Sequence, residues 1–178
     1  MRTGLEVFLK LESVQPCGSF KLRGVGHACE TLRQRGARRL VSSSGGNAGY
    51  AVAYAGRQLG MPVTVVVPET TSEQARKLIA SEGARVRVQG GSWQEANAHA
   101  QTLLDDESEF IHPFDHPLLW EGHASMIDEL AEQCGKPDVI ICSVGGGGLL
   151  AGIGEGLLRQ GWTDVGLLAV ETAGMASY

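Results

Sequence analysis

Five consecutive β-branched residues, Val63-Thr64-Val65-Val66-Val67, are the feature that most limits the folds open to this chain. A continuous apolar run of this length is typical of a strand that is buried on both faces. Such strands lie in parallel sheets whose two faces are covered by helices. Short apolar stretches and stretches of helical periodicity alternate along the rest of the chain, which predicts an α/β fold.

The predicted elements follow one another along nearly the whole chain. Strands are expected at residues 6–11, 39–42, 63–67, 85–89, 109–111, 138–144 and 165–171. Helices are expected at residues 19–34, 47–59, 72–82, 92–106, 118–134 and 149–160. The fourth of these helices begins with a capping box formed by Ser92 and Glu95. Because strands alternate with helices, we expect two lobes, each a parallel sheet with helices on both faces.

The periodicity breaks between Pro113 and Pro117, where two prolines and two histidines fall close together. We therefore place a domain boundary there. Residues 21–115 would form a small domain, and residues 1–20 with 116–178 a large domain. The sequence stops soon after a predicted strand, which would leave a sheet edge uncovered. On that ground we expect the large domain to be incomplete at its C-terminus.

Composition and charge argue against several classes of function. The net charge of −5 disfavours nucleic acid as a partner. No apolar stretch approaches the roughly 20 residues that cross a bilayer, and the first residues lack the apolar core of a signal peptide. The four cysteines are widely spaced and form no C-x-x-C pair, which fits reduced thiols. We expect a cytoplasmic protein that binds neither nucleic acid nor membrane.

Glycine is concentrated in two loops, Ser44-Gly45-Gly46-Asn47-Ala48-Gly49 and Gly145-Gly146-Gly147-Gly148. Each loop follows a predicted strand and opens a predicted helix, where backbone N–H groups lack partners and the helix dipole is positive. Glycine lets the backbone approach an anion closely, so such a loop can bind phosphate or carboxylate. For the four consecutive glycines we favour ligand binding over a simple tight turn, because their conformational entropy is costly.

The motif Ser19-Phe20-Lys21-Leu22-Arg23-Gly24 places a lysine in the first turn of a predicted helix. The positive helix end and partial burial both disfavour an ammonium ion, which lowers the amine pKa and makes Lys21 nucleophilic. A neutral amine can condense with an aldehyde. One reactive amine and two anion-binding loops therefore suggest a phosphorylated aldehyde cofactor and a substrate that carries a carboxylate. Asn47 could donate to a phenolate oxygen of that cofactor, and its ordinary role would be that of a helix N-cap, which it could fill at the same time.

A second interpretation of the later loop is a nicotinamide site. Gly146, Gly148 and Ala151 match the dinucleotide pattern G-x-G-x-x-[G/A], and Glu171 falls where an acid would bind ribose. This interpretation predicts an NAD-dependent oxidoreductase. It leaves Lys21 and the first glycine loop unexplained, so we rank it below the aldehyde cofactor.

Taken together, the lysine motif and the two glycine loops resemble the signatures of fold-type II pyridoxal-phosphate enzymes, which have the tryptophan synthase β-like fold. Within that group the chain is similar to the L-serine/L-threonine dehydratases, especially the animal-type serine dehydratases. Further motifs that fit this subgroup are Glu12-Ser13-Val14-Gln15-Pro16, Pro113-Phe114-Asp115-His116-Pro117 and Glu121-Gly122-His123-Ala124-Ser125. The resemblance implies that the large domain binds pyridoxal 5'-phosphate. It also implies a homodimer that converts L-serine and L-threonine to pyruvate or 2-oxobutanoate plus ammonia.

The resemblance also implies a role for each site residue. Lys21 would bond the cofactor and remove the substrate α-proton, Phe20 would pack on the cofactor ring, and Asn47 would bond its 3-oxygen. The substrate carboxylate would be bound by Ser44, Gly45, Asn47 and Ala48. The cofactor phosphate would be bound by Gly145, Gly146, Gly147, Gly148 and Leu149. Glu171 would bind a monovalent cation such as potassium.

Two further alternatives stay open on the sequence alone. The first is β-replacement on an activated serine, as in relatives of cysteine synthase. The second is a non-catalytic fragment that binds a cofactor or a partner. Gly45 also replaces an alanine of some relatives, which would widen the carboxylate pocket and alter substrate preference.

Overall fold

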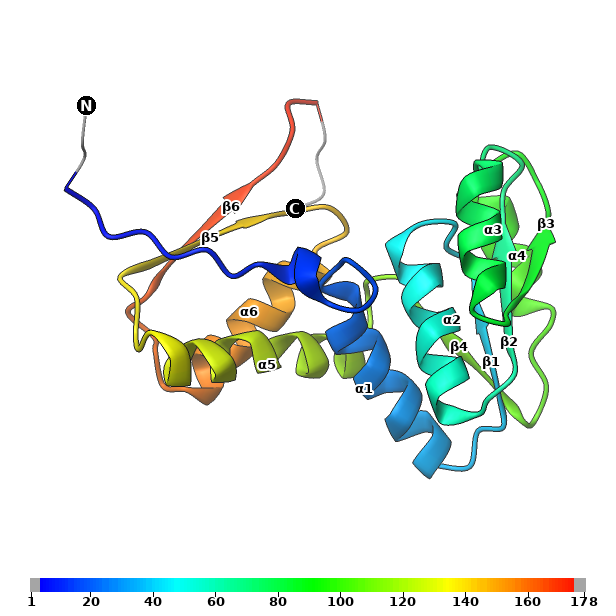
Figure 1. Ribbon diagram of the computed structural model, residues 1–178, viewed down its shortest axis with the longest axis horizontal. Helices are drawn as coiled ribbons and strands as arrows, with labels where there is room; N and C mark the ends of the chain where they lie inside the picture. The colour runs from blue at the N-terminus through cyan, green and yellow to red at the C-terminus, as the bar shows by residue number, and fades with distance from the viewer. Residues whose placement is uncertain (1–3, 175–178) are drawn as a thin grey trace.

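The structure, a computed structural model, describes residues 4–174 of the chain. Residues 1–3 and 175–178, at the two ends of the predicted large domain, lie outside the described residues. Figure 1 shows two groups of strands and helices with helix α1 (Lys21–Gln34) between them. The first group carries a four-stranded sheet and the second a two-stranded sheet.

The four-stranded sheet is parallel throughout and has the strand order β3-β2-β1-β4. Its strands are β1 (Arg39–Ser42), β2 (Val63–Val67), β3 (Arg85–Val88) and β4 (Ser108–Ile111). The run of β-branched residues forms β2, which lies inside the sheet with Val65 paired to Ser42 and to Val86. Val65, Val66 and Val67 are fully buried, as the sequence predicts.

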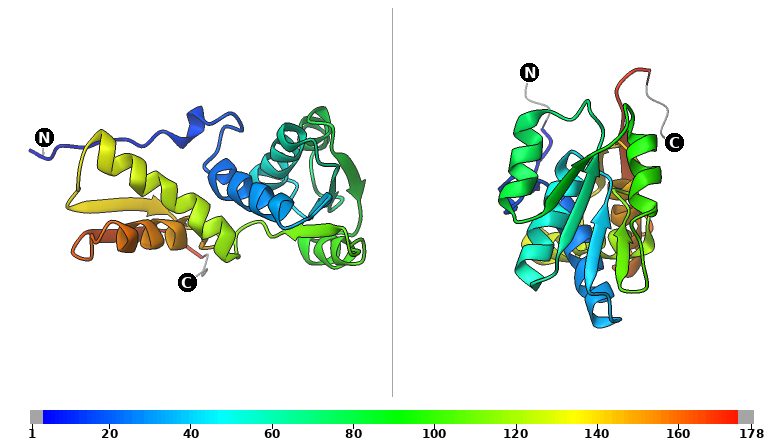
Figure 2. Two further views of the ribbon diagram at one scale, coloured as in Figure 1. Left: turned by 90° about the horizontal axis from the view of Figure 1, so that it is seen from below. Right: turned by 90° about the vertical axis from the view of Figure 1, so that its right-hand side faces the viewer.

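Helices cover both faces of this sheet, because successive strand residues point to opposite sides. Leu40 and Val65 join the core that α1 and α2 (Asn47–Leu59) cover, with α3 (Glu73–Ser81) beside them. Val41 and Val66 face the other way, onto α4 (Trp93–Gln101). The right-hand view of Figure 2 shows helices on both sides of the strands.

The second sheet pairs β5 (Val139–Ser143) with β6 (Gly166–Val170) in parallel. Helices α5 (Pro117–Gln133) and α6 (Gly148–Arg159) pack on one face around a second core that contains Cys142. Ile141 and Leu168, which are paired in register, point to the other face and are 66% and 53% exposed. Among the described residues, this sheet is therefore covered on one face.

The strand predicted at residues 6–11 is wrong. The described residues from 4 to 11 form no strand, and a short 3-10 helix, η1 (Glu12–Val14), follows them. Alternating apolar residues make a strand only when a neighbouring strand offers hydrogen bonds, and Val7 and Leu9 are exposed here. The segment is instead attached through Lys10, whose amine bonds Glu129 and Gln133 of α5.

Helix α1 packs against both α2 and α5 and so connects the two groups. Its crossing with α5 is close: a Cβ on Gly24 would lie 2.5 Å from the Leu119 carbonyl oxygen, and one on Gly122 would lie 2.5 Å from that of Arg23. Because α1 contacts both groups, the domain division at residues 21–115 stays a prediction. Within residues 4–174, none of the helices has the length and apolarity needed to cross a membrane.

Candidate active site

Lys21 is the first residue of α1, and its amine is held in a half-buried position. Lys21 Nζ donates a hydrogen bond to the Pro113 carbonyl oxygen at 2.7 Å and lies 5.1 Å from the centroid of the Phe20 ring. Burial lowers the pKa of the Lys21 amine from 10.5 to about 8. A sizeable share of the amine is therefore neutral, and nucleophilic, in mildly alkaline solution.

The Gly145–Gly148 loop joins β5 to α6 and is packed against Phe114. A Cβ on Gly146 would lie 2.4 Å from Phe114 Cγ, and one on Gly148 would lie 2.5 Å from the Phe114 carbonyl oxygen. Gly147, the N-cap of α6, adopts a left-handed conformation with φ of 80°. Within residues 4–174, the N–H groups of Gly145, Gly146 and Gly147 make no hydrogen bond. The loop thus presents free donors at a helix N-terminus.

Pro113 and Phe114 connect the lysine to this glycine loop. The Pro113 carbonyl accepts from Lys21, and the next residue, Phe114, fills the space beside Gly146 and Gly148. The Trp120 indole N–H donates to the Phe114 carbonyl at 3.3 Å, which fastens the turn to α5. The structure therefore brings Lys21, Phe20 and the Gly145–Gly148 loop to one place, although 120 or more residues separate the lysine from the loop in sequence.

The other glycine loop lies at the same edge of the four-stranded sheet as Pro113. The Ser42 hydroxyl, at the end of β1, donates to the Ile111 carbonyl at the end of β4, with a separation of 3.1 Å. The loop after β1 and the turn after β4 therefore leave the sheet side by side. A Cβ on Gly49 would lie 1.8 Å from the Ser44 carbonyl oxygen, so this fold of the loop requires glycine there.

Asn47 is the first residue of α2 and is exposed, while Gly46 is the N-cap. The predicted role of Asn47 as the N-cap is therefore wrong. Within the described part of the chain its amide makes no hydrogen bond, so it is free to bind a ligand. Ser44 and Gly45 are half-buried and Ala48 is buried. The described contacts do not link this loop directly to Lys21.

Leu149 and Glu171 are the remaining residues of the predicted site. Leu149 follows the glycines in the first turn of α6, and Glu171 follows β6 and is half-buried. Over residues 4–174, no group of three or more His, Cys, Asp or Glu side chains is arranged to hold a metal ion. A monovalent cation can also be bound by carbonyl oxygens, so the cation role of Glu171 stays a prediction.

Sequence reasoning missed the support that two histidines, the half-buried His112 and the buried His123, give to this region. His112 Nδ1 accepts hydrogen bonds from the N–H groups of Phe114 and Asp115, at 3.2 and 2.7 Å, and so shapes the turn that carries Pro113. His123 Nδ1 accepts from the Gly24 N–H of α1 at 3.1 Å. In the sequence, the motifs around Pro113 and Gly122 pointed to these two regions because they fit the family. They did not show which hydrogen bonds the histidines make.

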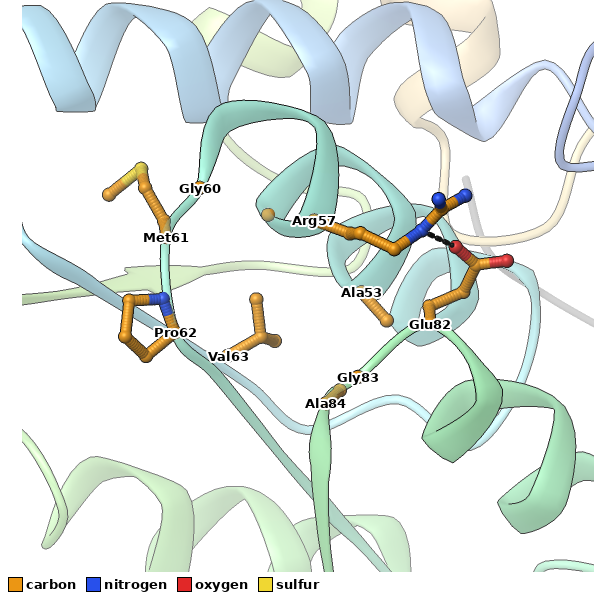
Figure 3. Close-up of a pocket in the computed structure, with 10 residues that line it drawn as sticks. Ala53, Arg57, Gly60, Met61, Pro62, Val63, Glu82, Gly83 and Ala84 are labelled. Atoms are coloured by element: carbon orange, nitrogen blue, oxygen red, sulfur yellow. Dashed lines mark hydrogen bonds and ion pairs between the residues drawn. The ribbon is translucent and has the colours of Figure 1, made fainter.

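A separate pocket of about 270 Å³ lies between α2, β2 and the end of α3, and contains none of the predicted site residues (Figure 3). It is lined in part by Met61, Val63 and Ala84. The ion pair between Arg57 and Glu82, with 2.6 Å between Arg57 Nε and Glu82 Oε2, borders it. Lys21 and both glycine loops lie outside this pocket.

A half-buried lysine with a lowered pKa, near a glycine loop at a helix N-terminus, has the groups that a phosphorylated aldehyde could bind. The family described as "Pyridoxal-phosphate dependent enzyme" matches residues 1–178. The chain belongs to this family, and its fold is the mixed α/β fold with parallel sheets of fold-type II pyridoxal-phosphate enzymes.

Curated relatives and a solved structure show which members of this family the chain resembles. Two proteins of Mus musculus, "Serine dehydratase-like" and "L-serine dehydratase/L-threonine deaminase", are 52% and 48% identical over 177 and 178 residues. Each alignment covers 98% of this chain and 54% of the relative. A fungal L-serine ammonia-lyase from Rhizomucor miehei superposes with a TM-score of 0.87 at 40% identity, covering 94% of this chain and 54% of that one. The chain spans about half the length of the curated relatives it matches.

Proposed function

We propose that the protein uses pyridoxal 5'-phosphate to deaminate L-serine, and L-threonine, by β-elimination to pyruvate or 2-oxobutanoate plus ammonia. The observation that carries the proposal is the connection from Lys21 Nζ through Pro113 and Phe114 to the Gly145–Gly148 loop. The Lys21 amine and the glycine loop contact neighbouring residues of one turn, Pro113 and Phe114, which supports a shared role in binding the cofactor. The names of the mouse relatives support the same substrates.

The residues present fit pyridoxal 5'-phosphate. The amine of Lys21 is half-buried with a lowered pKa, as covalent attachment of an aldehyde requires. The N–H groups of Gly145 to Gly148, with that of Leu149, would hold the phosphate at the positive end of α6. Phe20 would lie against the ring, and the free amide of Asn47 would donate to the 3-oxygen.

The cofactor, when bound, supplies an electron sink that stabilises negative charge at the substrate α-carbon. The chain's own residues orient the substrate and move its proton. Ser44, Gly45, Asn47 and Ala48 would bind the substrate carboxylate at the N-terminus of α2, where the helix dipole favours an anion. The Lys21 amine, with a pKa of about 8, would accept the proton that leaves the α-carbon, and the β-hydroxyl would take up a proton and leave as water.

Three further parts of the proposal rest on the family resemblance. They are a monovalent cation such as potassium at Glu171, a homodimeric assembly and a cytoplasmic location. The cation can be tested separately, since activity in potassium and in tetramethylammonium buffers of equal ionic strength would differ if Glu171 binds it, and Glu171→Gln would remove that difference.

The proposed reaction is tested by comparing Lys21→Ala with Lys77→Ala. Lys77 is an exposed lysine of α3 paired with Glu73, so its loss should leave catalysis unchanged. We expect Lys21→Ala to lower pyruvate formation from L-serine about 10³-fold or more, the range for loss of an acid–base group. A Lys21→Ala protein with full activity would refute the role of this lysine. Thioether or thiol formation from O-acetylserine, without pyruvate from serine, would favour β-replacement, and no turnover of either would indicate a non-catalytic protein.

A further inference from the structure

His123, on α5, contacts the start of α1 through Gly24 and Phe20. Its side chain is buried, with 1% of the residue exposed. Its Nδ1 accepts a hydrogen bond from the Gly24 N–H at 3.1 Å. Its ring meets the Phe20 ring edge to face, with 5.0 Å between centroids and 64° between planes. One imidazole therefore contacts the residue before Lys21, Phe20, and the residue three positions after it, Gly24.

The hydrogen bond to Gly24 replaces one that a regular α-helix would make. In a regular helix the Gly24 N–H would donate to the carbonyl four residues earlier, that of Phe20. Here the Phe20 carbonyl accepts from the Arg23 N–H at 3.0 Å, and the Gly24 N–H goes to His123. A buried N–H needs an acceptor, and in the first turn of α1 the imidazole supplies it for Gly24.

Two glycines leave room for this ring. A Cβ on Gly24 of α1 would lie 2.6 Å from His123 Cε1, and a Cβ on Gly152 of α6 would lie 2.3 Å from His123 Cβ. Any larger residue at either position would displace the imidazole. Since three helices enclose the ring at such short distances, its orientation is fixed.

The charges around His123 keep it neutral. Burial, together with the nearby positive charges of Lys21 and Arg23, lowers the pKa of His123 to about 3. With Nδ1 accepting a hydrogen bond, the single ring proton resides on Nε2. The Nδ1 atom, already occupied by the Gly24 N–H, is not available as a base for the reaction.

We propose that His123 is a positioning residue: by holding the Gly24 N–H and the edge of Phe20, its imidazole fixes the first turn of α1 and so directs the Lys21 amine towards Pro113 and the glycine loop. The inference rests on the proposed function, because it assigns His123 a task for the lysine that binds the cofactor. Without the Nδ1 acceptor, the first turn of α1 would change its hydrogen bonding, and the Lys21 amine would move towards solvent.

The test uses two substitutions of nearly equal size and shape. In His123→Asn the amide oxygen can take the place of Nδ1, whereas His123→Leu has no acceptor. Both lose the ring contact with Phe20, so the difference between them isolates the hydrogen bond to Gly24. His27→Leu, on the exposed side of α1, makes the same chemical change away from the site. If His123→Leu does not fold, His123→Gln, whose amide reaches past the Nδ1 position, replaces it.

The readout is covalent attachment of pyridoxal 5'-phosphate to Lys21, trapped with borohydride at a series of pH values and located by peptide mass mapping. We expect wild type, His27→Leu and His123→Asn to react with a midpoint near pH 8, the pKa of the buried amine. His123→Leu should react about tenfold more slowly at pH 8, as expected for loss of one buried hydrogen bond, with its midpoint shifted upwards.

The outcomes separate the two claims. Equal rates and midpoints for His123→Leu and His123→Asn, with attachment at Lys21 intact, would overturn the positioning role and leave the proposed function standing. Absence of attachment at Lys21 in wild type would overturn both. A loss of thermal stability shared by the two variants, with no difference in the pH profile, would mean that His123 only fills the core and would also overturn the inference.

Discussion

The Lys21 amine donates a hydrogen bond to the Pro113 carbonyl across 92 positions of sequence, at 2.7 Å. This contact ties the start of α1 to the turn that follows β4. The residue after Pro113 packs against the second glycine loop, so the same turn connects the lysine to the proposed phosphate site. The position of Pro113 thus decides where the amine lies relative to the glycines.

The lowered pKa of Lys21 predicts that folding stability rises with pH in one window. The amine titrates at about 8 in the folded state and at 10.5 when unfolded, so the unfolded chain binds more protons between these values. Stability contributed by neutral Lys21 therefore increases from about pH 8 to pH 10.5. In Lys21→Met this rise should disappear, and the variant should be up to about 3 kcal/mol more stable at pH 7. Urea unfolding of both proteins from pH 7 to pH 10.5 measures the difference, and identical pH slopes would contradict it.

Gly148→Ala should weaken cofactor binding. The new Cβ would lie 2.5 Å from the Phe114 carbonyl oxygen, which is backbone and cannot rotate away. We expect a loss of about 1–3 kcal/mol in stability from overpacking and at least tenfold weaker binding of pyridoxal 5'-phosphate. Gly154→Ala, in the same helix with open space around its Cβ, is the matched control and should be neutral or slightly stabilising. Fluorescence titration with the cofactor compares them, and equal affinities would show that the loop does not bind its phosphate.

Gly45→Ala should raise the KM for serine through a collision with Thr71. A Cβ on Gly45 would lie 2.5 Å from Thr71 Oγ1 and 2.7 Å from Thr71 Cγ2, so one of the two residues must shift. We expect a KM increase of several-fold, which corresponds to about 1 kcal/mol. Adding Thr71→Ala removes both colliding atoms and should restore the KM. A double-mutant cycle in kcat and KM tests this coupling, and additive effects would mean that Thr71 does not limit the pocket.

The ion pair between Arg23 and Glu129 predicts a loss of stability in acid. Hydrogen bonds from Arg23, the larger cause, and from Lys10 lower the pKa of Glu129 from 4.5 to about 2, so the stabilisation is present above pH 4.5 and fades as pH falls towards 2. Because the Glu129 side chain is 42% exposed, we expect solvent screening to limit it to about 1 kcal/mol. Glu129→Gln should remove this part of the acid sensitivity. Thermal melts of both proteins at pH 6 and pH 3 compare them, and the same change in Tm would contradict the account.

Local sequence patterns made much of the fold predictable. The run of β-branched residues predicts a strand that is buried on both faces, and the predicted bounds agree with β2 (Val63–Val67). The Ser92 hydroxyl accepts from the Glu95 N–H, as predicted for a helix start. The Glu95 carboxylate, however, binds the Gly91 N–H rather than that of Ser92, and α4 ends at Gln101, well before residue 106. The start of a helix is set by residues that are neighbours in sequence. The partner of the Glu95 carboxylate and the end of α4 depend instead on the turns on either side of the helix.

What the sequence did not reveal depends on contacts between distant segments. Whether residues 6–11 form a strand depends on a partner strand, which no local pattern specifies. His123 is buried because Gly24 and Gly152, on two other helices, leave space for it. The lysine motif and the glycine loops were recognised one at a time from local patterns, but their connection through Pro113 and Phe114 exists only once the two groups of elements pack together.

The central claim is that Lys21 is the residue to which pyridoxal 5'-phosphate becomes attached. Borohydride reduction of the purified protein after incubation with the cofactor, followed by proteolysis and mass mapping, tests it most directly. The account predicts one modified peptide, with the pyridoxyl group on Lys21. Modification of Lys10, Lys77 or Lys136 with Lys21 left free, or no modification at all, would contradict it.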